Sequence, residues 1–395
     1  MKRRWLSDLL MVLKMSHTYI FATTDIGIED LAAKEVSSLL SIDESSVKIT
    51  TGRIYFKARE SDIITLNFYS RTLNKVYILL AREEVKDLSD IYRIAKSIDY
   101  TQYINKNQTF AVRAERYGSH SFTSIDIARV VGQAVIDSYL DSQKCRLKVN
   151  LEVPDIEIYC MLRNQELVIG INTSGDSLHR RNYRVYNHPA ALKTTLAAAM
   201  IMLSSWDRKS GFIDPMCGGG TIVIEAALMA RNIAPGIYRR QFAFTKLRLF
   251  SDIDLNDLKL KIMSMANMNQ YPIEGIDISP YHLEGALINA MSAGVDDTII
   301  FKVGDARKLK KYIDFEPRVI VVNPPYGIRM HHRNLQTLYN EFISSVKEIP
   351  NVTVVVITAA SKEMRQAAFR AGVELVHTRR VLHGKLDSEI LVFST

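Results

Sequence analysis

Cysteine is scarce in this chain, and the cysteines present form no recognisable binding or cross-linking pattern. Only Cys145, Cys160 and Cys217 occur, and no two of them make a CxxC pair. Such spacing excludes the disulfide frameworks of small secreted proteins and argues against a structural zinc site. The sequence therefore predicts a protein of a reducing compartment, the cytoplasm, that holds no metal.

The chain also lacks a convincing targeting or membrane segment. Residues 1–14 begin with a basic cluster and continue into an apolar stretch that superficially resembles a signal peptide. However, Asp8 interrupts the apolar part, no small-x-small cleavage site follows, and the stretch is too short to span a bilayer. We interpret residues 1–16 as an N-terminal extension, either an amphipathic turn or a disordered segment, with Met15 as an alternative start. We expect no contact with a membrane.

Two familiar nucleotide-binding signatures are absent as well. The glycine-rich stretch 214–221 reads Asp-Pro-Met-Cys-Gly-Gly-Gly-Thr. It lacks the Gly-x-Gly-x-x-Gly spacing of dinucleotide folds, and no lysine follows the glycines as a P-loop requires. The stretch nevertheless follows a short apolar run and precedes a helical pattern over 222–230. A strand, a glycine-rich turn and a helix in this order present backbone N–H groups and a helix N-terminus to a ligand.

The composition is that of a globular protein large enough for two or more domains. The chain has 395 residues, of which 47% are hydrophobic and 24% charged. Its formal net charge of +8 suggests a polyanionic partner such as nucleic acid, although a basic cytosolic protein without one would carry the same surplus.

The first half of the chain predicts two small α+β modules. Residues 17–80 follow the β-α-β-β-α-β order of a ferredoxin-like domain, and residues 81–172 repeat the theme. Spacing alone favours arginines that are merely solvated and aromatics that belong to the core. The second module nevertheless contains candidates for a basic and aromatic RNA-binding surface, which are Arg113, Arg116, Phe122 and Arg129.

A polar, basic linker over 173–189 joins these modules to the rest of the chain. It is either a solvated connection or a contact for RNA phosphates, with Arg180 and Arg181 as the candidates. From residue 190 to 395 strands alternate with helices, which predicts an α/β domain built on a parallel sheet. The two final strand patterns predict a closing hairpin with an antiparallel strand at the sheet edge.

Acidic residues follow each of the first three strands of this domain, at Asp214, Asp277 and Asp305. A single aspartate there is most simply a helix cap. Three in succession suit a ligand with an amino acid part, a ribose diol and an adenine amine, which is S-adenosylmethionine. We expect Asp277 to accept the ribose hydroxyls, Asp305 to lie near the adenine amine, and the glycines to let the backbone approach the methionine part. The candidate cofactor contacts are Asp214, Met216, Cys217, Gly218, Gly220, Thr221, Asp277, Ile278, Asp305, Ala306 and Asn323.

The most specific signal is Asn323-Pro324-Pro325-Tyr326, which follows the apolar run 319–322. An exocyclic base amine is a poor nucleophile because its lone pair is delocalised into the ring. The Asn323 side-chain oxygen and the Pro324 carbonyl can accept its two N–H bonds and so localise the lone pair towards a methyl donor. Pro325 helps to fix the turn, and Tyr326 can stack on the base. Alignment then supplies most of the rate.

These motifs resemble known families over nearly the whole chain after residue 17. Phe110-x-x-Arg113, followed by Gly118-x-His120-x-Phe122-x-Ser124, resembles the THUMP domain, an RNA-binding module of tRNA-modifying enzymes. The segment before it is similar to the ferredoxin-like domain that accompanies THUMP. The resemblance implies that residues 81–172 and the linker contact RNA.

The second half resembles class I Rossmann-fold methyltransferases, in particular the RNA guanine-N2 methyltransferases that carry THUMP. The resemblance rests on three motifs, which are the stretch 214–221, residues 232–236 and the Asn-Pro-Pro-Tyr-Gly stretch 323–327. Relatives that act on guanosine 10 of tRNA mostly begin the last motif with aspartate. Asn323 therefore implies the branch acting on guanosine 6 of tRNA or the ribosomal RNA branch. The bacterial ribosomal form is commonly fused to a second methyltransferase, for which this chain has no room, so the resemblance favours tRNA and a monomeric enzyme.

Three other functions remain alternatives. A DNA adenine-N6 methyltransferase or a protein glutamine methyltransferase could share the Asn-Pro-Pro-Tyr chemistry, but neither accounts for residues 80–172. A non-catalytic RNA-binding protein could keep the first half, although the intact motifs of the second half argue against it.

Overall fold

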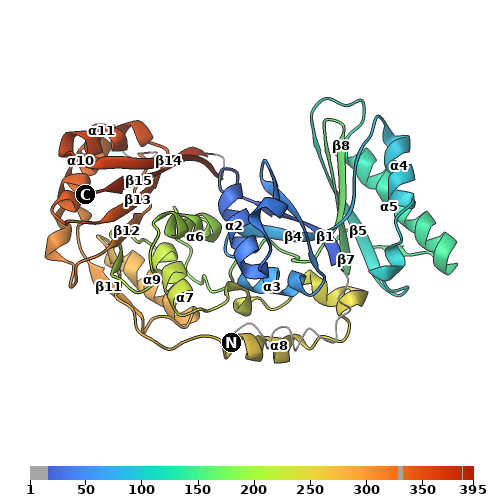
Figure 1. Cartoon of the computed structure of the whole chain (residues 1–395), viewed down its shortest axis with the longest axis horizontal. Helices are drawn as coiled ribbons and strands as arrows, with labels where there is room; N and C mark the ends of the chain where they lie inside the picture. The colour runs from blue at the N-terminus through green and yellow to red at the C-terminus, as the bar shows by residue number, and fades with distance from the viewer. Residues whose placement is uncertain (1–16, 328–331, 385) are drawn as a thin grey trace.

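A computed structural model describes residues 17–327, 332–384 and 386–395. The predicted N-terminal extension 1–16 lies outside the described residues. The chain forms two sheet-based halves that lie side by side, with the C-terminal half at one end of an elongated molecule (Figure 1). In the part of the chain described, no helix has the length and apolar character needed to cross a membrane.

The N-terminal half is one continuous eight-stranded sheet rather than two separate ones. Its strand order is β2-β3-β1-β4-β8-β7-β5-β6. The first four strands and two helices make the predicted ferredoxin-like module: β1 His17–Thr24, α2 Glu29–Leu40, β2 Lys48–Thr50, β3 Arg53–Arg59, α3 Asp62–Tyr69 and β4 Leu73–Glu84. The remainder forms the second module: α4 Leu88–Lys96, β5 Thr109–Tyr117, α5 Ser124–Gln143, β6 Lys148–Val149, β7 Ile156–Arg163 and β8 Glu166–Asn172.

The two modules merge because β4 pairs with β8 from Tyr77 onward, and β4 also runs further than its sequence pattern predicts. The apolar run suggests an end at Leu80, but the strand continues to Glu84 and pairs antiparallel with β8 along this extra length. Ile78 lies opposite Ile171 in that pairing, and their side chains join one hydrophobic core beneath α2 to α5. Cross-strand pairing with β8 outweighs the polar character of Arg82, Glu83 and Glu84.

The C-terminal half is a seven-stranded sheet in the order β11-β10-β9-β12-β13-β15-β14. All its pairings are parallel except those of β15, so the predicted parallel α/β sheet with an antiparallel hairpin at its edge is confirmed. The strands are β9 Phe212–Asp214, β10 Ile273–Asp277, β11 Ile299–Val303, β12 Val319–Val322, β13 Thr353–Thr358, β14 Glu374–His383 and β15 Leu386–Ser394. The helices are α6 Thr194–Leu203, α7 Thr221–Ala230, α9 Pro280–Ser292, α10 His332–Lys347 and α11 Ser361–Ala371.

Alternating residues of the central strands enter two hydrophobic cores, one on each face of this sheet. In β12, Val319 and Val321 belong to one core, whereas Ile320 and Val322 belong to the other. A strand buried on both faces is apolar at every position, which explains the unbroken run 319–322.

The segment 231–272 packs against the N-terminal half, although it lies within the C-terminal half in sequence. It contains three short 3-10 turns and the helix α8 Leu255–Met263, which runs beneath α3 in Figure 1. The Phe242 ring lies 4.7 Å from the Phe68 ring of α3, centroid to centroid. Gly236 sits so close to the α3 backbone that a Cβ there would approach the Phe68 Cα within 2.7 Å. This segment therefore ties the two halves together.

The closing hairpin provides a second connection between the halves. The Leu382 N–H donates to the Ile26 carbonyl at 3.2 Å, and Arg379 pairs with Asp30. Nearby, the buried Asp25 carboxylate accepts from the Lys193 ammonium at 2.9 Å, just ahead of α6. A carboxylate paired across the boundary fixes how the C-terminal half docks on the N-terminal sheet.

Candidate active site

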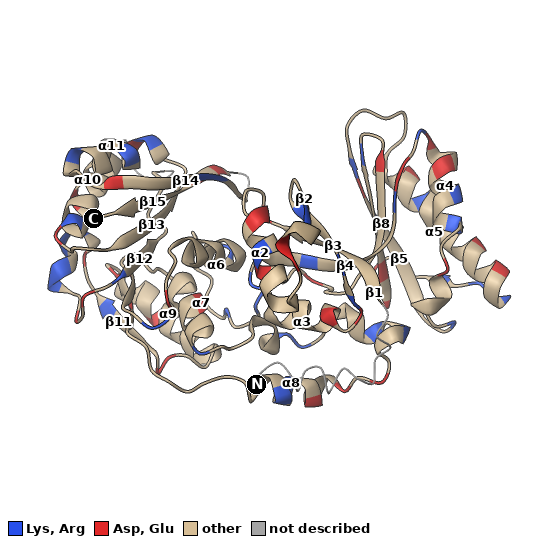
Figure 2. Cartoon of the chain, viewed as in Figure 1, with Lys and Arg blue, Asp and Glu red and all other residues tan. Residues whose placement is uncertain are grey.

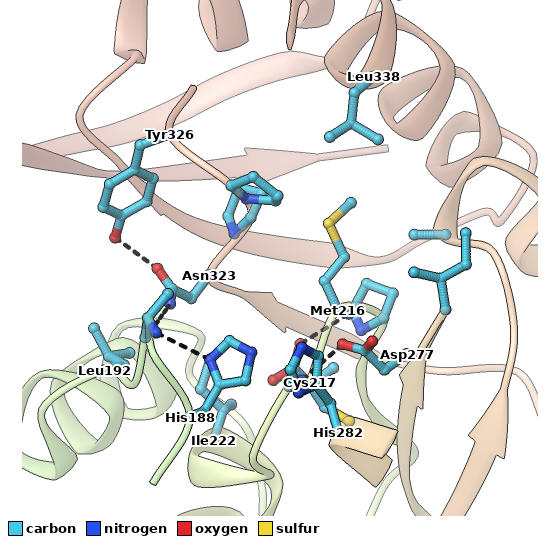
Figure 3. Close-up of a pocket in the computed structure, with 18 of the residues that line it drawn as sticks. His188, Leu192, Met216, Cys217, Ile222, Asp277, His282, Asn323, Tyr326 and Leu338 are labelled. Atoms are coloured by element: carbon cyan, nitrogen blue, oxygen red, sulfur yellow. Dashed lines mark hydrogen bonds between the residues drawn. The ribbon is translucent and has the colours of Figure 1, made fainter. Parts of the chain in front are cut away.

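Four predicted site residues meet at one edge of the C-terminal sheet. Asp214 and Asp277 end β9 and β10, Asp305 comes two residues after β11, and Asn323 follows β12 directly. These four strands are adjacent, so their carboxyl ends lie side by side, where open α/β sheets bind ligands. A pocket of about 1050 Å³ opens there (Figure 3). Every predicted cofactor contact lines it except Gly220, which belongs to the same turn as Gly218.

The glycine-rich turn is held by the neighbouring strand end. The Cys217 N–H donates to the Ile276 carbonyl at 2.9 Å, and the Gly218 N–H donates to Asp277 Oδ2 at 2.8 Å. Gly218 and Gly220 have positive φ angles of 50° and 78°, which other residues rarely adopt. The turn delivers the N-terminus of α7 to the pocket, where its partial positive charge favours an anionic ligand group.

The three aspartates have different environments. Asp277 accepts from the Gly218 N–H with one oxygen and from the Ser279 N–H with the other, at 2.9 Å. Each oxygen therefore keeps one acceptor position, which fits a ribose diol. Asp214 is only 1% exposed, and burial, with a contribution from the Asp277 charge, raises the pKa of its carboxyl well above the usual range. It accepts from the Met216 N–H at 3.2 Å and so supports the turn.

The Asp305 carboxylate already accepts several hydrogen bonds from Arg307, besides the contact predicted with the adenine amine. Its carboxylate accepts from the Arg307 backbone N–H at 3.0 Å and from the guanidinium of the same residue at 2.7 Å. These hydrogen bonds lower the pKa of Asp305. Arg307 also reaches Glu341 at 3.3 Å across the pocket rim. An adenine amine near Asp305 would therefore compete with Arg307 for the same oxygens.

The Asn-Pro-Pro-Tyr turn is cross-braced by side chains. Asn323 Oδ1 accepts from the Tyr326 hydroxyl at 2.6 Å, and Asn323 Nδ2 donates to the Ala190 carbonyl at 3.3 Å. The Tyr339 hydroxyl donates to the Pro325 carbonyl at 2.7 Å. These bonds orient the amide oxygen of Asn323, which Figure 3 shows between Tyr326 and His188.

Tyr326 makes a structural contact in addition to its predicted role as a stacking platform. Its hydroxyl holds Asn323, and its ring meets the His383 ring edge-on, at 6.2 Å and 80°. Burial raises the pKa of the Tyr326 phenol, which keeps the hydroxyl protonated and able to donate. In this structure Tyr326 supports the amide, and because it also lines the pocket, its stacking on a base stays a prediction.

Sequence reasoning missed the wall of the pocket formed by the linker. His188, Pro189 and Ala190 line the pocket, and His188 packs edge-on against His282 with 4.3 Å between ring centroids. Burial, followed by the neighbouring His282, lowers the pKa of His188. The tyrosines and histidines interleaved in this segment are the sequence feature that could have indicated a pocket wall, but in a basic linker they favour contact with RNA.

None of the predicted RNA contacts of the second module lines the pocket. Arg113 and Arg129 are exposed, and Arg129 pairs with Asp126 on its own helix at 2.6 Å. Arg116 donates to the Gly118 carbonyl, and Phe122 is half-buried against the core. Helix α5 carries Arg129 as its one basic residue among three aspartates, so acidic and basic residues share this surface (Figure 2). These four residues remain predictions as RNA contacts.

The two linker arginines behave differently from one another. Arg180 is exposed, but Arg181 is only 3% exposed, so its predicted contact with RNA phosphates does not fit the structure. The Arg181 guanidinium lies 3.3 Å from the fully buried Glu225 carboxylate and donates to the Arg71 carbonyl at 2.7 Å. Arg181 is buried because the buried Glu225 carboxylate requires a charged partner. Its contacts with Glu225 in the C-terminal half and with Arg71 in the N-terminal half join the linker to both halves.

Three family models match the chain in succession. The model described as "RMKL-like, methyltransferase domain" matches residues 181–389. The model of the "THUMP domain" matches residues 85–172, and that of the "RlmL ferredoxin-like domain" matches residues 19–77.

Individual relatives agree with these matches. A tRNA (guanine(6)-N2)-methyltransferase of Archaeoglobus fulgidus is 42% identical over 94% of this chain and 91% of its own length. The ribosomal RNA large subunit methyltransferase K/L of Aliivibrio fischeri is 32% identical over 83% of this chain, but over only 47% of its own length. The crystal structure of "a possible methylase" from Clostridium difficile superimposes with a TM-score of 0.84, at 29% identity, over 96% of this chain and 98% of its own.

Proposed function

The chain belongs to the RMKL-like methyltransferase family, and on this basis we propose that it methylates the exocyclic N2 of a guanosine in tRNA with S-adenosylmethionine as the methyl donor. The observation that carries the proposal is the meeting of the glycine-rich turn and the Asn-Pro-Pro-Tyr turn in one pocket. A cofactor site and an amine-orienting site lie together there. The predicted THUMP domain, which precedes the methyltransferase domain in this family match, accounts for an RNA substrate.

The residues of the pocket fit S-adenosylmethionine. When bound, it supplies a methyl group made electrophilic by the adjacent sulfonium. Asp277 retains one acceptor position on each oxygen for the ribose hydroxyls, and Gly218, which lines the pocket, lets the backbone come close to the methionine part. Ile278, which is 67% exposed on the pocket wall, offers an apolar contact for the adenine ring.

Asn323 and Pro324 orient the guanine amine. Asn323 Oδ1 accepts one hydrogen bond from Tyr326 and keeps its second lone pair for an amine N–H. The Pro324 carbonyl accepts the other N–H, so the nitrogen lone pair is directed away from both acceptors and towards the methyl donor. Tyr326 and Tyr339 hold the turn in place, and the rate derives from this alignment rather than from a strong base.

Guanosine 6 of tRNA is the target we favour. The relative named for this activity covers nearly the whole chain at 42% identity, whereas the ribosomal RNA relative is 32% identical and extends well beyond the matched region. Asn323 at the start of the motif agrees with either branch. A cytoplasmic location accords with a tRNA substrate and with the few, unpaired cysteines of the sequence.

Product analysis tests the proposal. Purified protein is incubated with labelled S-adenosylmethionine and either unmodified tRNA, large-subunit rRNA or DNA, and the methylated nucleoside is identified by mass spectrometry. We expect N2-methylguanosine in tRNA, and none in a matched transcript whose guanosine 6 and its pairing partner are exchanged for an A–U pair. Methylation of rRNA alone would replace the proposed substrate, and methyladenine in DNA would contradict both the substrate and the acceptor atom.

A further inference from the structure

One buried amide connects the interdomain linker to the glycine-rich turn. Asn289 lies in α9 and is 1% exposed. Its Oδ1 accepts from the backbone N–H groups of Val185 and Tyr186, both at 2.8 Å. Its Nδ2 donates to the Tyr186 carbonyl and to the Gly219 carbonyl, both at 3.0 Å. All four hydrogen-bonding positions of the amide are therefore used, and one of them reaches the turn next to Gly218.

The linker position set by Asn289 decides the shape of the pocket wall. The Tyr186 ring occupies the space beside Gly285, where a Cβ would come within 2.2 Å of it. The Tyr186 hydroxyl lies 2.7 Å from His282 Nδ1, on the same helix as Asn289. Tyr186 is thus held at both its backbone and its side chain, against one face of α9.

The residues that follow Tyr186 reach both ends of the site. The His188 ring lies against the glycine-rich turn, within 3.3 Å of the place where a Cβ on Gly218 would stand. Two residues later, the Ala190 carbonyl accepts from Asn323 Nδ2. A shift of the linker would therefore move His188 away from the cofactor turn and remove a partner from the amide that orients the base (Figure 3).

We propose that Asn289 is a positioning residue for the cofactor site, because it fastens the linker against the glycine-rich turn and so completes the pocket with His188. This inference deepens the proposed function and rests on S-adenosylmethionine as the ligand of the pocket. The amide is buried, and its loss leaves two N–H donors and two carbonyls without a partner, so the linker backbone must move to reach water.

Asn67 supplies a matched control elsewhere in the molecule. It is also 1% exposed, and its Nδ2 donates to the Ile63 carbonyl at 2.8 Å and to Thr173 Oγ1 at 3.1 Å. Its Oδ1 also accepts from Ser174 Oγ at 2.6 Å, so Asn67 holds the start of the linker, far along the chain from the linker residues that line the pocket. Its replacement by alanine removes a buried amide of the same size from that opposite end of the linker.

Calorimetric titration of the full-length protein with S-adenosylhomocysteine separates a positioning role from general destabilisation. We expect Asn289→Ala to weaken binding at least tenfold and Asn67→Ala less than twofold, with tRNA affinity of both variants within twofold of wild type. Asn289→Ser keeps a hydroxyl at the site and is titrated in parallel in case the alanine variant does not fold; we expect an intermediate loss.

Two outcomes would overturn the inference alone. Unchanged affinity in folded Asn289 variants would mean that the linker does not shape the cofactor site, and equal weakening by Asn67→Ala would reduce Asn289 to a core residue. If the wild-type protein bound neither S-adenosylhomocysteine nor S-adenosylmethionine, the proposed function itself would fail, and the inference with it.

Discussion

Replacing Asn323 by alanine should slow methyl transfer by two to three orders of magnitude. The side chain supplies one of the two acceptors proposed for the guanine amine. Removing one aligned hydrogen-bond partner of a reacting group typically costs about 10²–10³ in rate, or roughly 3–4 kcal/mol. The variant also releases the Tyr326 hydroxyl and the Ala190 carbonyl, each of which loses a hydrogen bond worth about 1 kcal/mol.

Asn323→Asp distinguishes the role of the Asn323 side chain as a hydrogen-bond acceptor from its role as a donor, because aspartate keeps only the acceptor. A carboxylate still accepts from Tyr326 and from the amine, but it cannot donate to the Ala190 carbonyl 3.3 Å away, and it repels that oxygen. We expect a smaller loss, about tenfold, because one weak hydrogen bond is replaced by a repulsive contact. The difference between the two variants isolates what the acceptor contributes.

The assay is single-turnover methyl transfer to tRNA at saturating enzyme and S-adenosylmethionine, with tRNA affinity measured separately by filter binding. Both variants should bind tRNA within twofold of wild type, because Asn323 acts on the base after docking. A transfer rate for Asn323→Ala within threefold of wild type would refute the assigned role. So would a loss in Asn323→Asp equal to that in Asn323→Ala, since the retained acceptor would then be irrelevant.

Two further predictions concern stability and are measured by urea unfolding. Arg181→Ala removes the nearer of the two guanidinium groups beside the buried Glu225 carboxylate, which keeps the Tyr183 hydroxyl at 3.1 Å and Arg71 at 4.0 Å, and should destabilise the protein by about 3 kcal/mol. The neighbouring Arg180 is exposed, and Arg180→Ala should change stability by less than about 0.5 kcal/mol; similar values for the two variants would contradict the structural role of Arg181. Burial lowers the pKa of His179 from its ordinary 6.5 to about 4, so the unfolded chain binds the extra proton between these values. The free energy of unfolding is therefore unaffected by His179 above pH 6.5 and falls by about 2 kcal/mol, after allowance for solvent screening, as the pH drops towards 4. His179→Gln should flatten the plot of unfolding free energy against pH in this range. An unchanged plot would rule out this role of His179.

The strand-end residues of the C-terminal half could be predicted because local pattern and topology agree there. Alternating strands and helices require a parallel sheet, and a parallel sheet brings its carboxyl ends to one edge, so Asp214, Asp277 and Asn323 had to meet. The same reasoning could not predict that the Arg307 guanidinium donates to the Asp305 carboxylate or that the Tyr326 hydroxyl donates to Asn323. Those contacts depend on side-chain directions within a few ångströms, which residue spacing does not specify.

Longer-range arrangements were harder to predict, and β4 shows why. Its end depends on whether a partner strand is present, and the partner, β8, lies more than eighty residues further along the chain. The segment 231–272 is a similar case, because its phenylalanines would be core residues in either half. Only the surface offered by α3 determines that they pack against the N-terminal half.

The order of residues along this chain determined the chemistry: a glycine-rich turn after one strand, an Asn-Pro-Pro-Tyr turn after another, and acids at the strand ends between them. These features are local, since backbone conformation and strand polarity follow from neighbouring residues. The tertiary structure alone decided that the linker forms a wall of the pocket, that Arg181 is buried while Arg180 is exposed, and that Asn289 holds the linker to the glycine-rich turn. Each of these depends on segments about 40 to 130 residues apart, whose meeting is governed by the packing of whole helices and sheets rather than by any nearby pattern.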